Sequence, residues 1–552
     1  MLKLEDRLKE TIKINFKLKT YRMKTQKLKQ IPADGWAGFK ENFKADAISG
    51  FIVFLLALPL SLGIAKAADF PPIMGLISAI IGGLLVSFIM GSRLSIKGPA
   101  AGLIVIIAGS VSDFGHGDAV LGWKLALGAM VVAGLVQIIF GVLKLGKLAD
   151  FFPLSAIHGM LAAIGIIIIA KQIPVLLNDA PDISKGMSPL QLLWNIPYFI
   201  KNLDPKAALI GVVSLLIMLL WPGIKNKTIK MIPAALVVLI FAIPAEFFMD
   251  FANTEPSYAL LEVGSLLDNL NINASFAGVF QTGIFIKYVI MFALVGSLES
   301  LLTVKAIDML DPHQRKSDMN KDLIAVGIGN TIAAFLGGVP MISEVARSSA
   351  NVANGAQTRW ANFFHGFFIL IFLLVAAPVL EMIPNSALAA MLVAVGIKLT
   401  HPREFKHVLK IGKEQLLIFI VTIVVTLAED LLIGIVAGMV LKMIIHLING
   451  VPIGSFFKAP TVVSNIGDDY LVEIDKSAIF TNYLGIKRVL EAIPEGLNIT
   501  IDLEKTKLVD HSVMENLEHF KHDYQFSGGK VYIKGLENHK PMSAHRLAGR
   551  VL

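Results

Sequence analysis

The stretch Ile96–Ile104 (IKGPAAGLI) interrupts an otherwise apolar region with an adjacent glycine and proline, and Gly337–Arg347 (GGVPMISEVAR) does the same much later in the chain. Proline has no N–H to donate and a fixed φ, so a helix begins after each interruption and does not run through it. Each interruption starts a short apolar segment, the third of the first seven and the third of the last seven. Such paired breaks indicate an inverted repeat with a binding site near the middle of the membrane.

Apolar segments recur on both sides of these breaks, and several have the ~20 residues needed to cross a hydrocarbon core of about 30 Å. Hydrophobic residues make up 55% of the chain and charged residues only 17%, which is too few to cover the surface of a water-soluble domain. The predicted fold is an all-α polytopic membrane domain of about 14 transmembrane helices in a 7+7 inverted repeat. The expected segments are residues 47–65, 71–90, 99–112, 122–143, 154–176, 207–220, 231–249, 284–304, 322–338, 344–356, 359–381, 387–400, 413–428 and 431–448.

The loops between these segments alternate in charge. Loops after odd-numbered segments are acidic or neutral, whereas loops after even-numbered segments are basic. The positive-inside rule then places the basic loops and both termini in the cytoplasm, for a multi-pass protein of the cell (inner) membrane. This arrangement accounts for the net charge of +8 without a nucleic-acid partner. The basic residues concerned are Arg93, Lys97, Lys144, Lys147, Lys225, Lys227, Lys230, Arg315, Lys316, Lys321, Arg359, Arg403, Lys406, Lys410 and Lys413.

The chain divides into three predicted parts: a basic cytoplasmic segment at 1–44, a transport domain at 45–450 and a small soluble α/β domain at 458–552. The first part is either an amphipathic helix that lies on anionic membrane lipid or a solvated basic tail. In the last part, alternating β and α patterns predict a compact α/β unit. We expect its strands at 468–474, 497–503 and 530–534, and its helices at 482–492 and 512–520.

A carboxylate within the eighth segment is the clearest candidate for a coupling group. Gly296, Glu299 and Thr303 share one helix face, because they are spaced by three and four residues. A charged residue inside a membrane span costs free energy of insertion, so we interpret it as a functional residue. Glu299 and Thr303 can hold Na⁺, or Glu299 can exchange a proton. The alternative is that Glu299 caps the N-terminus of a neighbouring helix.

The tenth segment carries the candidate anion site. If a half-helix begins near Ser343, its free N–H groups and positive dipole end attract an anion. Arg347, one turn further, adds a fixed positive charge, and Glu344 can either pair with it or cap the helix. The predicted substrate-binding residues are Ser343, Glu344, Val345 and Arg347 together with Gly98, Pro99, Ala100 and Ala101, whose half-helix start supplies a second positive end.

These motifs together resemble the SulP (sulfate permease) family of anion transporters with a C-terminal STAS domain. The resemblance rests on Ala57–Ala65 (ALPLSLGIA), Gly98-Pro99, the Gly296–Thr303 stretch, Asn320–Asn330, and Gly337–Pro340 followed by Arg347. The sequence departs from the family at Glu344, where small residues are usual, and at Ala346, where serine commonly precedes the arginine. The added carboxylate suggests either proton coupling or a pair with Arg347.

The resemblance implies a seven-plus-seven repeat divided into a core domain and a gate domain, with an anion held between the third and tenth helices. It also implies an elevator-like movement of the core, and a homodimer with intertwined STAS domains. Relatives that import bicarbonate with Na⁺ place a carboxylate and a hydroxyl where Glu299 and Thr303 stand. Ser512 falls near a position that is phosphorylated in stand-alone STAS proteins. We expect Asp510 to be the helix N-cap there instead.

The sequence therefore predicts a secondary active transporter, a symporter or exchanger, of small inorganic anions such as sulfate or bicarbonate, with Na⁺ or H⁺ as the coupling ion. No cofactor and no enzymatic activity are expected, since no nucleophile elbow, zinc-binding helix or dinucleotide fingerprint is found. The alternatives are a nucleobase or dicarboxylate carrier of the same fold, an uncoupled anion channel, and a membrane-bound sensor that signals through the STAS domain.

Overall fold

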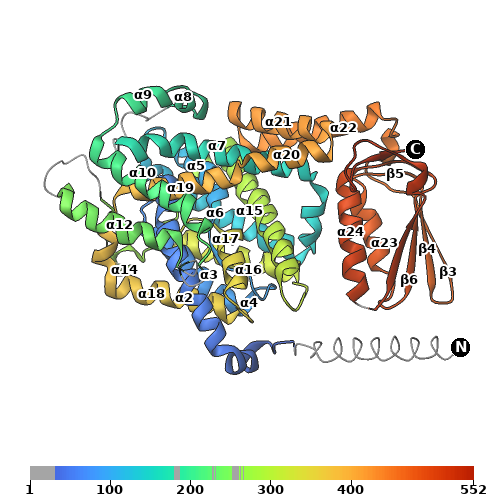
Figure 1. The fold of residues 1–552 in the computed structure, drawn as a ribbon, viewed down its shortest axis with the longest axis horizontal. Helices are drawn as coiled ribbons and strands as arrows, with labels where there is room; N and C mark the ends of the chain where they lie inside the picture. The colour runs from blue at the N-terminus through green and yellow to red at the C-terminus, as the bar shows by residue number, and fades with distance from the viewer. Residues whose placement is uncertain are drawn as a thin grey trace, which may run out of the picture.

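The computed structural model describes residues 31–178, 187–226, 229, 232–251, 260–261, 263–264, 266–526 and 528–552. A large helical domain is followed by an α/β region at its side (Figure 1). Most of the predicted basic segment at 1–44, namely residues 1–30, lies outside the described residues, as does residue 231 at the start of the seventh predicted segment.

Each of the fourteen predicted segments contains helix in the part of the chain that the structure describes. The elements of the helical domain are α2 (Gly35–Ala67), α3 (Ile73–Leu84), α4 (Val86–Ile89), β1 (Lys97–Pro99), η1 (Ala101–Leu103), α5 (Ile104–Gly115), α6 (Ala119–Val142), η2 (Leu145–Phe151), α7 (Leu154–Asn178), α8 (Pro189–Trp194), α9 (Ile196–Lys201), α10 (Pro205–Leu220), η4 (Trp221–Gly223), α12 (Ala234–Met249), α14 (Leu266–Asn269), η5 (Phe276–Phe280), α15 (Thr282–Leu310), α16 (Met319–Phe335), β2 (Met341–Ser343), α17 (Val345–Ala353), α18 (Trp360–Glu381), α19 (Asn385–Leu399), α20 (Pro402–Ile411), α21 (Lys413–Ala428), α22 (Leu431–Ile448) and η6 (Ile453–Ser455). Among the described residues, 7 helices are long and apolar enough to cross a membrane, and the other predicted segments contain shorter ones.

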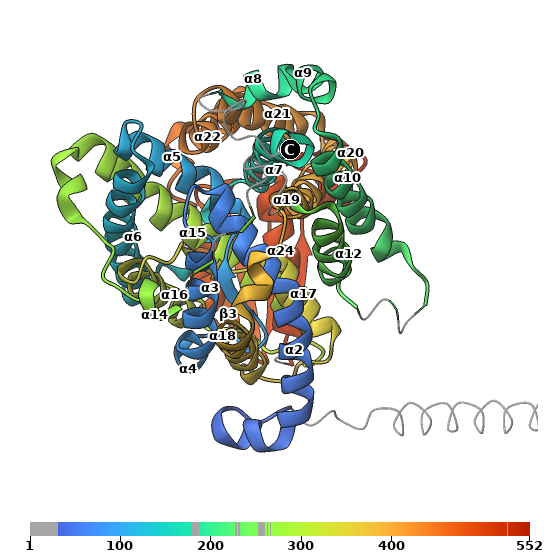
Figure 2. The ribbon, with the colours of Figure 1, turned by 90° about the vertical axis from the view of Figure 1, so that its left-hand side faces the viewer.

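The two Gly/Pro breaks form the centre of the helical domain. Each break is a short extended stretch, β1 or β2, that leads into a half-helix, and the two stretches pair as an antiparallel two-stranded sheet. Helix α3 packs on β1, while α15 packs on both β2 and α17. Figure 2 shows α3, α15 and α17 together in the middle of the helical domain. Both breaks are therefore confirmed, and they meet inside the molecule.

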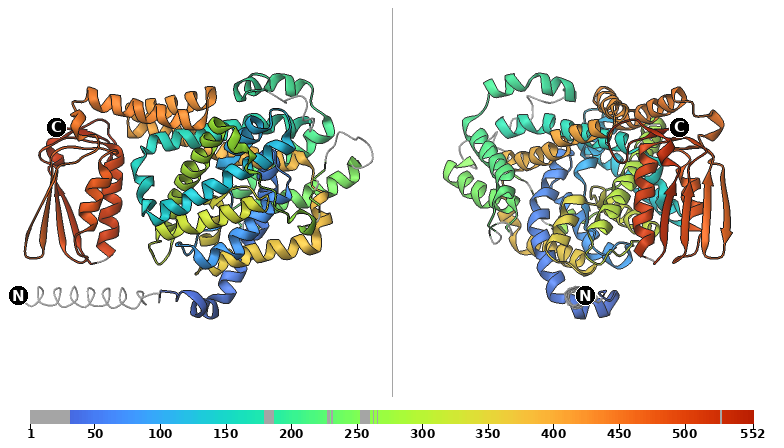
Figure 3. Two further views of the ribbon diagram at one scale, coloured as in Figure 1. Left: turned by 180° about the vertical axis from the view of Figure 1, so that it is seen from behind. Right: turned by 45° about the vertical axis from the view of Figure 1, so that its right-hand side comes forward.

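The C-terminal region has the expected α/β fold. Its main sheet has the order β3-β4-β6-β8, with β3 antiparallel to β4 and the other strands parallel. A second sheet has the order β5-β7-β10-β9. Helix α24 lies on the side that faces the helical domain (Figures 1 and 3). The elements are β3 (Thr461–Ile466), β4 (Asp469–Ile474), β5 (Lys476–Ala478), α23 (Tyr483–Glu491), β6 (Asn498–Asp502), β7 (Thr506–Val509), α24 (His511–Phe526), β8 (Lys530–Lys534), η7 (Leu536–Asn538), β9 (Lys540–Pro541) and β10 (Arg550–Val551).

Buried charges join this region to α22. The carboxylate of Asp510 lies 3.3 Å from Lys442 Nζ and 3.2 Å from His446 Nε2. It also accepts the backbone N–H of Phe480 at 2.8 Å and that of Val513 at 2.8 Å, so the predicted N-cap is confirmed. Burial alone would raise the pKa of Asp510, but Lys442, His446 and the N–H donor hold that pKa below its usual value.

A second contact joins the region to α15. Lys305 Nζ lies 3.2 Å from Asp150 Oδ1 and donates to Asn516 Oδ1 of α24 at 3.0 Å. The other carboxylate oxygen of Asp150 accepts from Lys487 of α23. Burial would raise the pKa of Asp150, but the two lysines lower it below the usual value. The C-terminal region is thus tied to two different helices of the helical domain.

Candidate functional site

The site lies where β1 and β2 pair as antiparallel strands, here called the β1–β2 crossing. Lys97 is opposite Ser343, Gly98 is opposite Ile342, and Pro99 is opposite Met341. After β1 the chain enters η1 and then α5, and no side chain caps the start of η1 at Ala100. No capping side chain therefore accepts the backbone N–H groups in the first turn of this half-helix.

The tenth-segment half-helix begins two residues later than expected. Ser343 is the last residue of β2, because its backbone is held extended against Lys97, and α17 starts at Val345. Glu344 is the N-cap, and its carboxylate accepts the backbone N–H of Arg347 at 2.7 Å. Of the two roles expected for Glu344, capping is confirmed. The alternative, a side-chain pair with Arg347, does not form, because none of the three guanidinium nitrogens has a hydrogen-bonding partner among the described residues.

Arg347 is the most unusual side chain of the site. It is 0% exposed, and its Nε, Nη1 and Nη2 have no hydrogen-bonding partner among the described residues. The guanidinium lies directly against Gly98, since a Cβ added there would be 2.4 Å from Nη1. Buried charges are normally paired. The guanidinium beside Gly98 is therefore a set of donors with no acceptor among the described residues.

Glu299 of α15 lies against the start of the third segment. Its side chain is 7% exposed, and Oε1 has no hydrogen-bonding partner in the described part of the chain. A Cβ added at Gly102 would be 2.2 Å from Oε1 and 2.5 Å from Oε2. The carboxylate thus lies over the first turn of the half-helix. Gly98 and Gly102 together leave room for one cationic and one anionic side chain at the start of this segment.

The other predicted residues lie around this pair. Gly296 faces Gln137, whose Nε2 would be 3.1 Å from an added Cβ, and Thr303 is buried one turn beyond Glu299. Pro99 and Ala100 are buried and Ala101 is half-buried. Val345, at the first position of α17, is 53% exposed.

A chain of amides fixes β2 beside the site. Asn330 donates to Gln137 at 2.8 Å and accepts the N–H of Met341 at 2.7 Å. These two amides also line a small cavity together with Leu103 and Pro340. Gln137 and Asn330 were not among the predicted site residues, because a single amide in an apolar segment carries no pattern.

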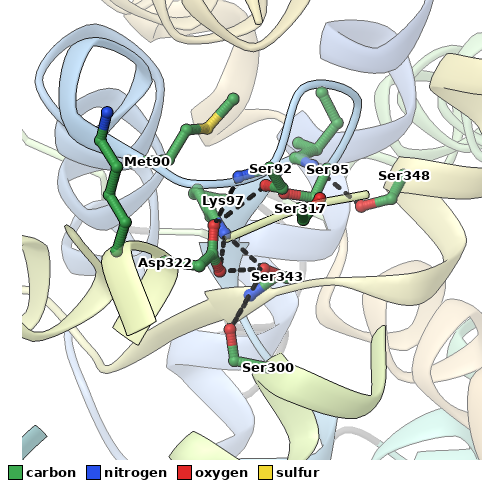
Figure 4. Close-up of polar contacts among 12 residues, drawn as sticks. Met90, Ser92, Ser95, Lys97, Ser300, Ser317, Asp322, Ser343 and Ser348 are labelled. Atoms are coloured by element: carbon green, nitrogen blue, oxygen red, sulfur yellow. Dashed lines mark hydrogen bonds and ion pairs between the residues drawn. The ribbon is translucent and has the colours of Figure 1, made fainter. Parts of the chain in front are cut away.

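Lys97 was assigned to a cytoplasmic loop, and that prediction is wrong. Its side chain is 0% exposed, and Nζ donates to Asp322 Oδ2 of α16 at 2.6 Å and to Ser343 Oγ at 2.5 Å (Figure 4). Ser300 of α15 donates to Ser343 Oγ at 3.1 Å. The sequence "SIKGP" places this lysine one residue before the break, so it follows β1 into the protein interior.

The arrangement suits a small anion. Guanidinium donors without acceptors bind a planar or tetrahedral oxyanion through charge-assisted hydrogen bonds. The start of η1, which no side chain caps, adds backbone N–H groups whose partial positive charge also attracts an anion. Glu299, against Gly102, is a carboxylate that a cation or proton can neutralise.

Comparisons with known proteins show which family this chain is similar to. The model of the sulfate permease family matches residues 43–422. The bicarbonate transporter BicA of Picosynechococcus sp. is 27% identical over 400 residues, which cover 72% of this chain and 69% of the relative. The high affinity sulfate transporter 2 of Stylosanthes hamata is 25% identical over 382 residues, which cover 68% of this chain and 57% of the relative. Both relatives are named as transporters and not as enzymes, in agreement with the prediction.

Solved structures give the same fold. The transmembrane domain of a cyanobacterium bicarbonate transporter BicA matches with a TM-score of 0.63 at 23% identity, over 73% of this chain and 98% of that chain. The structure of SLC26A9 matches with a TM-score of 0.64 at 14% identity, over 90% of this chain and 84% of that chain. The family model covers most of the helical domain, and the second match extends through the C-terminal region. The chain therefore belongs to the sulfate permease family.

Proposed function

We propose that this protein is a secondary active transporter of small oxyanions such as sulfate or bicarbonate. The observation that carries the proposal is the buried, unpartnered guanidinium of Arg347 against Gly98. Most buried polar groups in proteins have a partner, so an unsatisfied one calls for an explanation such as a missing ligand. Relatives named as bicarbonate and sulfate transporters support the choice of substrate class.

The anion binds between Arg347 and the start of η1. Its charge replaces the missing acceptor of the guanidinium, and its second oxygen faces the uncapped N–H groups beyond Ala100. Arg347 is 0% exposed, and the lower effective dielectric of a buried site strengthens these interactions relative to bulk solvent. The two half-helix segments then form opposite walls of one binding site.

Glu299 couples anion movement to a cation. Either Na⁺ binds between Glu299, Thr303 and the backbone near Gly296, or Glu299 takes up a proton, so that the loaded carrier is closer to neutral. In this proposal the core domain moves past the gate domain as an elevator, in a homodimer of the inner membrane with both termini in the cytoplasm. The C-terminal region then acts as a regulatory STAS domain.

Uptake into proteoliposomes tests the proposal. Purified full-length protein is expected to accumulate labelled sulfate or bicarbonate when a Na⁺ gradient or a pH gradient is imposed, the two being varied separately. A lack of uptake of every small oxyanion under both gradients would contradict it. Uptake of labelled uracil or a dicarboxylate would favour the other carriers of this fold, and current without coupling would favour a channel.

The variant Glu299→Gln tests the coupling role separately. It preserves the shape of the side chain and removes its charge, so gradient-driven uptake should be lost while exchange of anion for anion continues. Wild-type accumulation by this variant would rule out Glu299 as the coupling group.

A further inference from the structure

A buried ammonium group lies beneath the anion site. Lys97 Nζ is held by the carboxylate of Asp322 and the hydroxyl of Ser343, with no exposed surface (Figure 4). Its backbone N–H donates to Asn362 Oδ1 of α18 at 3.0 Å. The lysine is therefore fixed at both its backbone and its tip, and it cannot move to the surface without breaking these contacts.

The groups around this ammonium are those that hold hard cations. Asp322 Oδ1 accepts from the backbone N–H and the hydroxyl of Ser92 at 3.2 and 3.0 Å. Ser343 is linked in turn to Ser300, whose hydroxyl accepts the N–H of Ser343 at 3.1 Å. Carboxylate and hydroxyl oxygens are the preferred ligands of ions such as Na⁺, Mg²⁺ and Ca²⁺. Lys97 thus occupies a position lined with oxygen ligands.

This position belongs to the same crossing as the anion site. The Cα of Lys97 is opposite that of Ser343, and the next residue, Gly98, lies against the guanidinium of Arg347. The ammonium also joins four parts of the core: β1, β2 through Ser343, α16 through Asp322, and α15 through Ser300. A positive charge at this point holds the two half-helix starts together and compensates Asp322 permanently.

We propose that Lys97 is a built-in cation, which fills an oxygen-lined position at the β1–β2 crossing that a free monovalent cation would otherwise fill. This inference rests on the proposed transport of anions and adds that the crossing needs no external Na⁺. In this role Lys97 is a positioning residue: it does not contact the anion but keeps both half-helix starts in place. A coupling cation, where one is used, then binds at Glu299 and not at Ser343.

Replacement of the lysine should create a cation site. In Lys97→Met the carboxylate of Asp322 and the hydroxyls of Ser343 and Ser300 remain, without the ammonium. We expect the melting temperature of purified Lys97→Met to be at least about 2 °C higher in NaCl or NH₄Cl than in choline chloride of equal ionic strength. The wild type should show a smaller difference, limited to what a coupling cation at Glu299 contributes.

Uptake gives the second measurement. Lys97→Met should lose at least about tenfold of the uptake rate in choline medium, because one partner of a buried charge pair is gone. Na⁺ should restore part of that rate in the variant and stimulate it more strongly than the wild type, in which only Glu299 is available to a coupling cation. The double variant Lys97→Met/Asp322→Asn is the matched control: it removes both charges and should respond to cations no more than the wild type does in either measurement.

The outcomes separate this inference from the proposed function. Two outcomes would overturn the built-in cation. One is a melting temperature of Lys97→Met that is the same in all three salts. The other is wild-type uptake that requires Na⁺ together with a Glu299→Gln variant that still responds to Na⁺. Cation-dependent melting of Lys97→Met in a protein that takes up no anion leaves it standing and rejects the transport proposal. If Lys97→Met does not fold in any salt, the same melting and uptake measurements are made on Lys97→Gln. Its side chain is polar and retains part of the length of the lysine stem.

Discussion

Two groups of buried charges in this protein are held in different ways. At the junction with the C-terminal region, Asp510 is surrounded by Lys442, His446 and two backbone N–H donors. At the crossing of β1 and β2, the guanidinium of Arg347 and one oxygen of Glu299 have no hydrogen-bonding partner among the described residues. Both groups are buried to a similar degree, so burial alone does not distinguish them.

The difference lies in what each group does for the folded state. A buried charge pair whose members are fully hydrogen-bonded becomes strongly destabilising only when one partner is removed. A buried charge without a partner destabilises the empty protein and is retained only if a ligand supplies the partner. The junction is therefore structural, whereas the crossing is where our proposal places the anion.

The largest expected effect is the loss of the unpartnered charge. Arg347→Gln should reduce anion uptake by on the order of 100-fold or more, because the charge-assisted hydrogen bonds to the anion disappear. Its melting temperature should stay the same or rise, since a desolvated charge has been removed. A strong fall in the melting temperature with uptake retained would reverse the roles assigned to the two regions.

The junction should respond in the opposite way. Asp510→Asn leaves Lys442 buried without a carboxylate, which costs about 3–5 kcal/mol and lowers the melting temperature by on the order of 10 °C. Uptake per folded molecule, measured below the transition, should change little. The double variant Lys442→Met/Asp510→Asn should recover most of the stability. A double variant that melts no higher than the single one would contradict the pairing.

The glycine beside the guanidinium gives a smaller effect. A methyl group at Gly98 would collide with Arg347 Nη1, so Gly98→Ala should displace the guanidinium and lower uptake by about tenfold through a higher KM for the anion. Gly283→Ala is the control, because nothing lies within 4 Å of a Cβ added at that position of α15. Equal uptake by both variants would show that Arg347 does not depend on this contact.

The smallest effect concerns pH at the junction. His511 Nδ1 lies 2.7 Å from the carbonyl oxygen of Leu547, and Nε2 lies 3.3 Å from Glu515. Burial lowers the pKa of His511 below its ordinary value of 6.5. The neutral ring is therefore favoured by folding, and its contribution to stability is complete above about pH 6.5 and decreases as the pH falls below it.

The measurement is the melting temperature at pH 7.5 and pH 5.5. Wild-type protein should melt about 2 °C lower at pH 5.5, and His511→Asn, whose amide can still donate to Leu547, should show a smaller difference. An unchanged difference in the variant would assign the pH dependence to another group.

The spans and the two breaks could be predicted because they depend on patterns along the chain. Apolar length and Gly/Pro placement determine them locally, and the fourteen expected segments all contain helix among the described residues. The role of Asp510 as a cap was also predictable from its place before a helical pattern.

Side-chain pairing at the site could not be predicted in the same way. A lysine that follows an apolar segment and Arg93 has the pattern of a cytoplasmic loop, yet Lys97 is buried because its partner Asp322 arrives from a distant segment. For Glu344 both a cap and an ion pair satisfied the spacing, and only the direction of the carboxylate decides between them. The strands β3, β5, β7, β9 and β10 were not predicted; of these, β5, β9 and β10 have only two or three residues and carry no periodicity.

Helix α15 carries Glu299 near the crossing and Lys305 at the contact with Asp150 and Asn516. The two positions are six residues apart, or about 9 Å along one rigid rod. If α15 moves along its axis by more than a few ångströms, either the contacts of Lys305 break or Asn516 and its helix α24 move with α15. Glu299 and the C-terminal region are therefore connected through less than two turns of one helix.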